Sequence, residues 1–290
     1  MKRLLLTYDA PGWAFHGECL DMQWHLERCY PGRVETVIRR GCQVGAFTQY
    51  DAVYSSAWYD DRLSQHPRAA SQLSSTSYWL PCEKAINRKH LLKRWRWLAT
   101  KNTAIQQALM PEDHPAPQLL YHQINPERWP FQLPPPVRGS FRIGFAGHRQ
   151  ANKGPELIEA AAKLPGVELV TVEWDKGRLP QEEMPNWYHK LHAYICASKT
   201  EGGPRTGLEA MLCGVPIIST RVGQLHEMAP DGEVLFVDRT VEAMRHGIQQ
   251  LIENSSHREW MSEQARYIGA MWAITYGSKW ADFLIEVAGA

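Results

Sequence analysis

Short apolar runs alternate with longer mixed segments along this chain. Residues 2–8 form an apolar run typical of a buried strand, and residues 18–29 follow with helical spacing of their apolar positions. The same order returns later, with a strand pattern at 141–147 and a helical pattern at 155–163. Because strands that alternate with helices are typical of parallel sheets, the pattern predicts an α/β fold.

Other elements complete this picture, and a proline run divides it. We expect strands at 34–39, 52–55 and 215–220, a helix end followed by a strand within 189–198, a helix that ends at Gly214, a long helix at 88–109 and a last helix at about 279–287. The run Leu133-Pro-Pro-Pro136 reads as a stiff, extended linker. The predicted divisions are a first lobe at 1–134, a second lobe at 139–270 and a terminal helix at 271–290.

The most informative stretch begins at Glu201 and reads Glu-Gly-Gly-Pro-Arg-Thr-Gly-Leu-Glu. Its two carboxylates, Glu201 and Glu209, are separated by seven residues. Gly202 and Gly203 let a ligand approach the backbone, and Pro204 suits the first turn of a helix. Carboxylates accept hydrogen bonds from hydroxyl groups, and helix N-termini favour anions, so the stretch fits a sugar nucleotide. On spacing alone, an ordinary loop with solvated glutamates fits equally well.

This stretch resembles the E-x7-E signature of family 4 glycosyltransferases, which are retaining nucleotide-sugar enzymes of the GT-B fold. The resemblance implies two Rossmann-like lobes that face a central cleft, with an acceptor-side first lobe and a donor-side second lobe. It continues through 220–227 and 231–237. The positions that meet the family pattern are Ser198, Glu201, Gly202, Pro204, Leu208, Glu209, Ala210, Met211, Gly214 and Pro216.

A second block is similar to the family's G-R-x-x-x-x-K-G segment, whose basic residues neutralise the donor diphosphate. Gly147 ends the preceding strand, and Lys153 falls at the expected distance from it. His148 occupies the usual arginine position, and Arg149 follows one place later. The resemblance therefore implies that Lys153 is the main catalytic cation and that Arg149 is the second.

The family also implies roles for the donor-site residues. Glu201 would bind hydroxyl groups of the sugar, and Glu209 would bind the nucleotide ribose. Retention of configuration is expected without a metal or another cofactor, and a UDP-sugar is the favoured donor. Gly207 lies within the motif helix, although glycine is a poor helix former. The expected donor-binding set is Gly147, Gly202, Gly203, Pro204, Thr206 and Glu209.

Acceptor contacts are expected from the first lobe. The loop at 9–17 follows the first strand, and in this fold it faces the cleft. His16 in this loop is the candidate hydrogen-bond partner for the transferred sugar, and a purely structural hydrogen bond is the equal alternative. The other acceptor-side candidates are Gly12, Trp13, Arg94 and Arg96.

Charge divides unevenly between the two halves of the chain. Residues 1–138 hold 17 Lys and Arg against 12 Asp and Glu, and residues 139–290 hold 15 against 19, for a net charge of +1. Much of the positive excess lies at 88–97, where two tryptophans interleave with the cations. Such a helix favours an anionic acceptor or surface, either phospholipid headgroups or nucleic acid. Alternatively, Trp95 or Trp97 faces the core while the cations face water.

Three function classes remain. The first is a glycosyltransferase acting on a hydroxyl of a glycan or a lipid-linked cell-envelope acceptor. The second is an enzyme like the compact phage glycosyltransferases that modify hydroxymethylated pyrimidines in DNA. The third is a non-catalytic sugar-nucleotide-binding protein. A Rossmann dehydrogenase and a P-loop enzyme are excluded, because neither G-x-G-x-x-G after a strand nor a G-K-[ST] ending occurs.

Cysteine spacing and hydropathy bear on location. Six cysteines show no C-x-x-C spacing or metal-ligand clustering, which favours a reduced protein without a structural metal. No apolar run approaches the ~20 residues of a membrane span. We therefore expect a cytoplasmic protein, with a position at the inner face of the membrane as the alternative. The sequence does not identify the acceptor or the oligomeric state.

Overall fold

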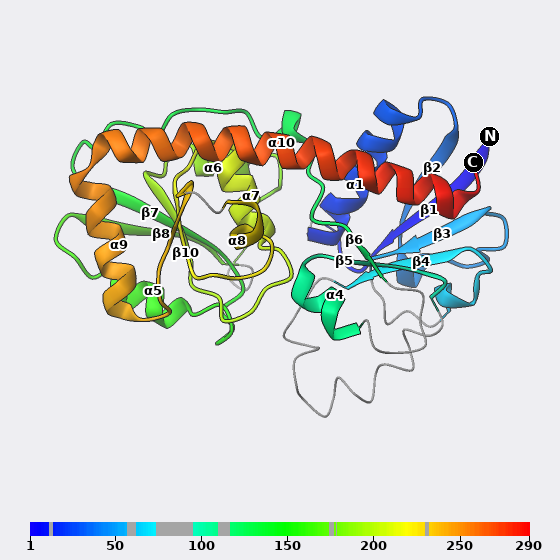
Figure 1. The fold of residues 1–290 in the computed structure, drawn as a ribbon, viewed down its shortest axis with the longest axis horizontal. Helices are drawn as coiled ribbons and strands as arrows, with labels where there is room; N and C mark the ends of the chain where they lie inside the picture. The colour runs from blue at the N-terminus through cyan, green and yellow to red at the C-terminus, as the bar shows by residue number, and fades with distance from the viewer. Residues whose placement is uncertain are drawn as a thin grey trace. The chain divides into compact units, whose positions relative to one another are not determined.

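The computed structural model describes residues 1–11, 14–56, 62–73, 95–109, 117–173, 177, 179–229 and 232–290. The chain forms two compact units: unit 1 joins Met1–Asn125 with Trp272–Ala290, and unit 2 is Pro126–Met271. Each unit is built on a parallel sheet flanked by helices (Figure 1). The α/β prediction with two Rossmann-like lobes is therefore confirmed.

Unit 1 contains a six-stranded sheet in the order β2-β1-β3-β4-β5-β6. Its elements are β1 (Lys2–Tyr8), α1 (Ala14–Cys29), β2 (Val34–Arg40), η1 (Gly41–Gln43), β3 (Ala52–Ser55), η2 (Leu63–Gln65), β4 (Ala69–Leu73), β5 (Trp97–Thr100), α4 (Thr103–Leu109) and β6 (Gln118–Leu119).

Both faces of this sheet are covered, as a parallel sheet requires. Leu4 and Leu6 point to one face, where they pack with Met22 of α1 and with Trp280 near the end of the chain. Leu5 points to the other face and packs in a separate cluster. Leu4, Leu5 and Leu6 thus form a continuous apolar run because β1 is buried on both faces at these positions.

The prediction of one helix at 88–109 is wrong at residues Trp97–Thr100, whereas residues Thr103–Leu109 are helical. Residues Trp97–Thr100 form strand β5, which pairs in parallel with β4. The helix α4 begins only at Thr103, and Asn102 precedes it and accepts a hydrogen bond from Ile105 N at 2.8 Å. This capping bond starts a new helix rather than continuing an old one. The part of the prediction at 88–94 lies outside the described residues.

Unit 2 contains a five-stranded sheet in the order β11-β10-β9-β7-β8. Its elements are η4 (Pro126–Arg128), β7 (Phe141–Gly147), α5 (Pro155–Ala161), β8 (Val167–Glu173), α6 (Met184–Tyr188), β9 (Ala193–Cys196), α7 (Arg205–Leu212), β10 (Ile217–Ser219), α8 (Leu225–Met228), β11 (Val234–Phe236) and α9 (Val241–Glu253).

The strand order places a switch point between β7 and β9. The chain leaves β7 for β8 on one side of the sheet and then returns to β9 on the other side. In doubly wound sheets, ligands bind outside the carboxyl ends of the strands at such a point. The loops after Gly147 and after Cys196 are therefore the expected position of a site in this unit.

Apolar residues of α5 and α9 cover one face of this sheet. Ile158 of α5 and Ile248 of α9 pack with Ile143 and Ile195 of the strands, and all four are buried. Thr240 caps α9 by accepting a hydrogen bond from Ala243 N at 3.1 Å. This packing fixes β7 and β9, whose loops carry the candidate site.

Unit 2 begins at Pro126, earlier than the break predicted after residue 134. The reason is local: Gln132 N donates to Cys213 O at 3.2 Å, and His189 Nε2 lies 2.8 Å from Pro130 O. Gly214 completes this contact, because a Cβ there would lie 2.6 Å from Gln132 O. The chain before the proline run is thus packed against unit 2.

The last helix is longer than predicted. It was expected at about 279–287, whereas α10 runs from Ser255 to Ala288 without a break. Residues up to Met271 belong to unit 2, and those from Trp272 belong to unit 1. Among the described residues, no helix combines the length and apolar character needed to cross a bilayer.

A buried polar cluster lies within unit 1. Glu18 of α1 is fully buried and accepts a hydrogen bond from Gln72 Nε2 at 2.5 Å. His122 Nδ1 lies 2.8 Å from Glu18 Oε1, and Lys101 Nζ lies 4.0 Å from Glu18 Oε2. The Lys101 ammonium also lies 4.4 Å from the ring centroid of Trp280. This cluster places opposite charges together in the interior of unit 1.

Candidate functional site

Lys153 and Glu201 meet at the switch point of unit 2. Lys153 lies in the loop after β7, and Glu201 lies in the loop after β9. Lys153 Nζ donates a hydrogen bond to Glu201 Oε1 and forms an ion pair with it. Ser198 Oγ donates to the same oxygen at 2.7 Å. The Lys153 and Glu201 side chains keep 29% and 12% exposure, so solvent reaches both.

The loop of Gly202 and Gly203 is supported by the loop after β10. Gln224 N donates to Gly202 O at 3.2 Å. Gly223 has φ of 54°, and a Cβ there would lie 2.7 Å from Gly202 O. Only glycine combines this backbone conformation with such a close approach. The backbone after Glu201 is therefore held closely against its neighbour.

Glu209 is buried on α7 and is already engaged by protein groups. Arg205 Nε lies 3.0 Å from Glu209 Oε1, one helical turn earlier. Tyr188 Oη donates to Glu209 Oε2 at 3.2 Å. Burial, followed by the charge of Glu209, raises the pKa of Tyr188, so the phenol remains protonated and able to donate. In this structure Glu209 is thus neutralised by Arg205, a partner that the sequence analysis did not assign.

Other predicted donor residues lie around these groups. Thr206 Oγ1 accepts a hydrogen bond from Tyr194 Oη at 2.7 Å. The Tyr194 hydroxyl also lies 3.3 Å from Ala146 O, beside Gly147. Pro204 precedes α7, and its carbonyl accepts from two amides of the first turn. Tyr194 therefore connects the start of α7 to the end of β7.

Packing explains why a glycine occupies position 207 of α7. A Cβ at this position would lie 3.1 Å from Leu225 Cδ1, and Leu225 is fully buried in α8. The departure from a good helix former thus allows α7 and α8 to approach closely. It does not disturb the motif helix, which spans Arg205–Leu212.

Arg149 is directed to other carboxylates. Its guanidinium lies 2.5 Å from Glu159 of α5 and 3.3 Å from Glu173 at the end of β8. The pKa of Arg149 is raised, mainly by the hydrogen bond to Glu159. The contacts described for Arg149 therefore place it with α5 and β8, whereas Lys153 contacts Glu201.

The predicted acceptor-side residues are described only in part. His16 lies in α1, and its ring centroid is 4.3 Å from that of Tyr8, so the helix begins within the segment expected to be a loop. Arg96 is exposed, and its guanidinium lies 5.0 Å from the ring centroid of Trp97. Gly12, Trp13 and Arg94 lie outside the described residues.

Both tryptophans of the basic segment make contacts within unit 1. Trp95 is buried in the core of unit 1, with 2% exposure. Trp97 Nε1 donates to Glu286 at 3.2 Å. The interpretation that one of these rings faces the core is therefore confirmed for Trp95.

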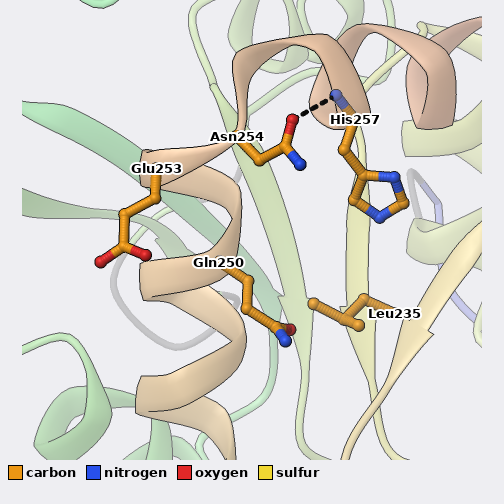
Figure 2. Close-up of a pocket in the computed structure, with 5 residues that line it drawn as sticks. All are labelled: Leu235, Gln250, Glu253, Asn254 and His257. Atoms are coloured by element: carbon orange, nitrogen blue, oxygen red, sulfur yellow. Dashed lines mark hydrogen bonds between the residues drawn. The ribbon is translucent and has the colours of Figure 1, made fainter.

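A separate pocket of about 490 Å³ lies at the junction of α9 and α10. Figure 2 shows the bond from His257 N to Asn254 Oδ1, which is 2.9 Å long, beside the side chains of Gln250 and Leu235. None of the predicted site residues lines this pocket. Within the described part of the chain, no group of three or more His, Cys, Asp or Glu could hold a metal ion.

Sequence reasoning assigned no role to four residues beside the site. Asn152 and Arg239 hold the loops, and Tyr188 and Arg205 contact Glu209. The pairing of Arg205 with Glu209 had a signal, since residues four apart face each other on a helix. The contact of Tyr188 in α6 with Glu209 had no such local signal, because the two residues lie in different helices.

A comparison with known protein families matches residues 174–267 to the family of glycosyl transferases group 1. Both Glu201 and Glu209 lie within the matched segment, and Lys153 lies before it. The resemblance to glycosyltransferases inferred from the sequence is therefore confirmed for this segment.

Individual relatives agree with this match. The chain is 32% identical over 83 residues to O-antigen chain mannosyltransferase B of Escherichia coli, covering 29% of this chain and 22% of that protein. It is 30% identical over 131 residues to D-inositol 3-phosphate glycosyltransferase of Arthrobacter sp. strain FB24, covering 34% and 31%. The matches thus span about a fifth to a third of the length of these relatives.

Solved structures extend the likeness to the whole fold. Anabaena HepE, solved in complex with UDP-glucose, superimposes with a TM-score of 0.76 at 15% identity, covering 99% of this chain and 100% of that chain. Sucrose-phosphate synthase from Thermosynechococcus elongatus gives a TM-score of 0.76 at 14% identity, covering 99% of each chain. The GT-B fold class is confirmed, and at these identities the likeness concerns the fold alone.

Proposed function

We propose that this protein is a retaining glycosyltransferase that moves a sugar from a nucleotide-sugar donor to a hydroxyl acceptor. The observation that carries the proposal is the contact between Lys153 and Glu201 at the switch point of unit 2. It brings a cation suited to a diphosphate beside a carboxylate suited to sugar hydroxyls, next to the start of α7.

In this proposal the donor replaces the contact between Lys153 and Glu201. Lys153 donates to the diphosphate and stabilises the charge that develops as the sugar–phosphate bond breaks. Glu201 accepts hydrogen bonds from sugar hydroxyls, and the amides of Gly202 and Gly203 lie beside the sugar. Because Arg149 is held by Glu159 and Glu173, Lys153 provides most of the positive charge. No metal or other cofactor takes part.

The proposed donor is a UDP-sugar, consistent with the complex of HepE with UDP-glucose. The proposed acceptor is a hydroxyl of a glycan or a lipid-linked envelope precursor, consistent with the O-antigen mannosyltransferase among the relatives. The DNA alternative depended on tryptophans interleaved with cations at 88–97. Since Trp95 is buried, this segment offers less for base stacking than the sequence indicated.

A thermal-shift screen against UDP, GDP, ADP and dTDP and their sugar conjugates, without added metal, tests donor binding. A ligand at about 100 times its Kd stabilises the folded state by about 2.7 kcal/mol, so a selective shift identifies the base. Release of free nucleotide from the selected sugar conjugate then measures turnover. A binder that shows a shift without turnover would be the non-catalytic protein instead.

Lys153→Met is expected to lower this turnover by at least about 100-fold, because one preorganised charge contributes that much. The matched control is Lys163→Met, which removes an exposed lysine just beyond α5 and should retain turnover. If no nucleotide raises the melting temperature, or if Lys153→Met retains full turnover, the proposed function is wrong.

A further inference from the structure

Asn152 joins the loop of Lys153 to the loop of Glu201. Its Nδ2 donates to Thr200 O at 2.9 Å, and its Oδ1 accepts from Thr200 N at 3.2 Å and from Thr200 Oγ1 at 3.0 Å. Its backbone carbonyl also accepts from Lys199 N at 2.7 Å. Asn152, immediately before Lys153, is thus hydrogen-bonded to Thr200, immediately before Glu201.

Arg239 makes a second connection between the same two loops. It follows β11, so it reaches them from a different part of unit 2. Its Nε donates to Ala197 O at 2.9 Å, and its Nη2 donates to Ala151 O at 2.9 Å. One guanidinium therefore bridges a carbonyl just after β9 and a carbonyl in the loop after β7.

Gly154 allows this close approach. It has φ of 66°, and a Cβ there would lie 2.8 Å from Ala197 O and 3.1 Å from Arg239 Nη2. Any side chain at this position would push the two loops apart. Asn152, Arg239 and Gly154 thus act on one joint between loops that are far apart in the sequence.

We propose that Asn152 and Arg239 are positioning residues, which hold the backbones of the Lys153 and Glu201 loops at a fixed separation before the donor arrives. The inference rests on the proposed function, because it concerns the same site. Lysine and glutamate side chains are flexible, and both loops contain glycine. Without the joint, Lys153 and Glu201 would be displaced from the positions that the reaction requires, and displacements of about 1 Å at a catalytic group cost about 100-fold in rate.

The test uses Asn152→Leu and Arg239→Gln, with turnover of the donor found by the nucleotide screen. Each variant should lower kcat by about 10- to 100-fold while the Kd for the bare nucleotide changes by less than about threefold. The double variant should be little worse than either single variant, because both changes open the same joint.

Matched controls separate positioning from stability. Asn254→Leu removes an asparagine that bonds to a backbone amide at the start of α10, and Arg245→Gln removes an arginine that bonds to Ala160 O of α5. Both controls should lower the melting temperature to a similar degree and leave kcat unchanged. Equal losses of kcat in the controls, or unchanged kcat in Asn152→Leu and Arg239→Gln, would overturn the proposal.

Amide hydrogen exchange provides a readout that does not need activity. Either positioning variant should speed exchange in both loops, at 148–154 and at 198–203, whereas the controls should not. If the wild-type protein turns over no donor, the proposed function fails while this measurement still decides whether the joint exists. If exchange in the loops is unchanged in both variants, the joint itself is refuted.

Discussion

Arg205 and Glu209 form a buried ion pair one turn apart in α7, with Nε and Oε1 separated by 3.0 Å. Both side chains keep only 6% exposure. Removing one partner of such a pair leaves a charge in the interior, which costs about 3–5 kcal/mol. Glu209 is therefore important for folding as well as being the proposed ribose ligand.

Glu209→Ala should accordingly destabilise the protein by about 3–5 kcal/mol, whereas Glu201→Ala, whose side chain is nearer solvent, should cost less than about 1.5 kcal/mol. Urea midpoints of the two variants measure the difference. Glu209→Gln retains an acceptor for Tyr188 and should lie between them. Equal midpoints for Glu209→Ala and Glu201→Ala would show that the pair with Arg205 contributes nothing to stability.

Two glycines with the same backbone conformation separate a steric effect from a backbone effect. Gly154 and Gly166 have φ of 66° and 73°, but a Cβ at Gly166 would meet nothing within 4 Å. Gly166→Ala should cost about 1–2 kcal/mol through its backbone alone. Gly154→Ala should cost at least about 1–3 kcal/mol more, because the Cβ also meets Ala197 O. Chemical denaturation measures both, and equal costs would contradict the close approach.

Lowering the pH should reduce the stability of unit 2 through His192, which is 1% exposed. Burial, helped by the charge of Arg142, lowers the pKa of His192 from its ordinary 6.5 to about 4. The unfolded chain therefore takes up a proton near pH 6.5, and the folded chain does so only near pH 4. The stability from the neutral ring is complete above pH 6.5 and is lost as the pH falls toward 4, by up to about 1.4 kcal/mol per pH unit.

The measurement is the free energy of unfolding of wild type and His192→Asn between pH 7.5 and pH 4. The asparagine oxygen can accept the hydrogen bond that Arg142 N now donates to His192 Nδ1 at 2.7 Å, and asparagine does not titrate in this range. Wild type should lose more stability than the variant between pH 6.5 and 4. Parallel pH profiles would rule out His192 as the cause.

The buried cluster of unit 1 should show strong coupling between Glu18 and Lys101. Lys101→Met alone should cost about 3 kcal/mol, because it removes a cation near a fully buried carboxylate and its contact with Trp280. Glu18→Gln combined with Lys101→Met should cost clearly less than the sum of the single changes. A double-mutant cycle measures this coupling, and strictly additive costs would contradict it.

Local patterns predicted the strands of the sheets better than the long helices. β3 and β7 were predicted with their observed bounds, because each is a short apolar run that ends in small or polar residues. The segment at 97–100 was misjudged, since its apolar residues fit either a helix or a buried strand. Pairing with β4, which is distant in sequence, decided in favour of the strand.

The candidate site could be predicted only in part, because some of its contacts join residues that are distant in sequence. The contact between Lys153 and Glu201 follows from two motifs that each end a strand, and neighbouring parallel strands bring their carboxyl ends together. The partners of Arg149 could not be inferred, because they depend on the side chain leaving the loop toward β8. The bridge by Arg239 was likewise hidden, since no local pattern marks an arginine that bonds to distant carbonyls.

The assignment of residues 272–290 to unit 1 has a consequence for synthesis. The core of unit 1 includes Trp280, Phe283, Leu284 and Val287 from the end of the chain. The ribosome releases these residues after the whole of unit 2, which is continuous in sequence. Although domains made first usually fold first, we expect the second unit here to fold first, and the first unit to fold only after residues 272–290 have left the ribosome.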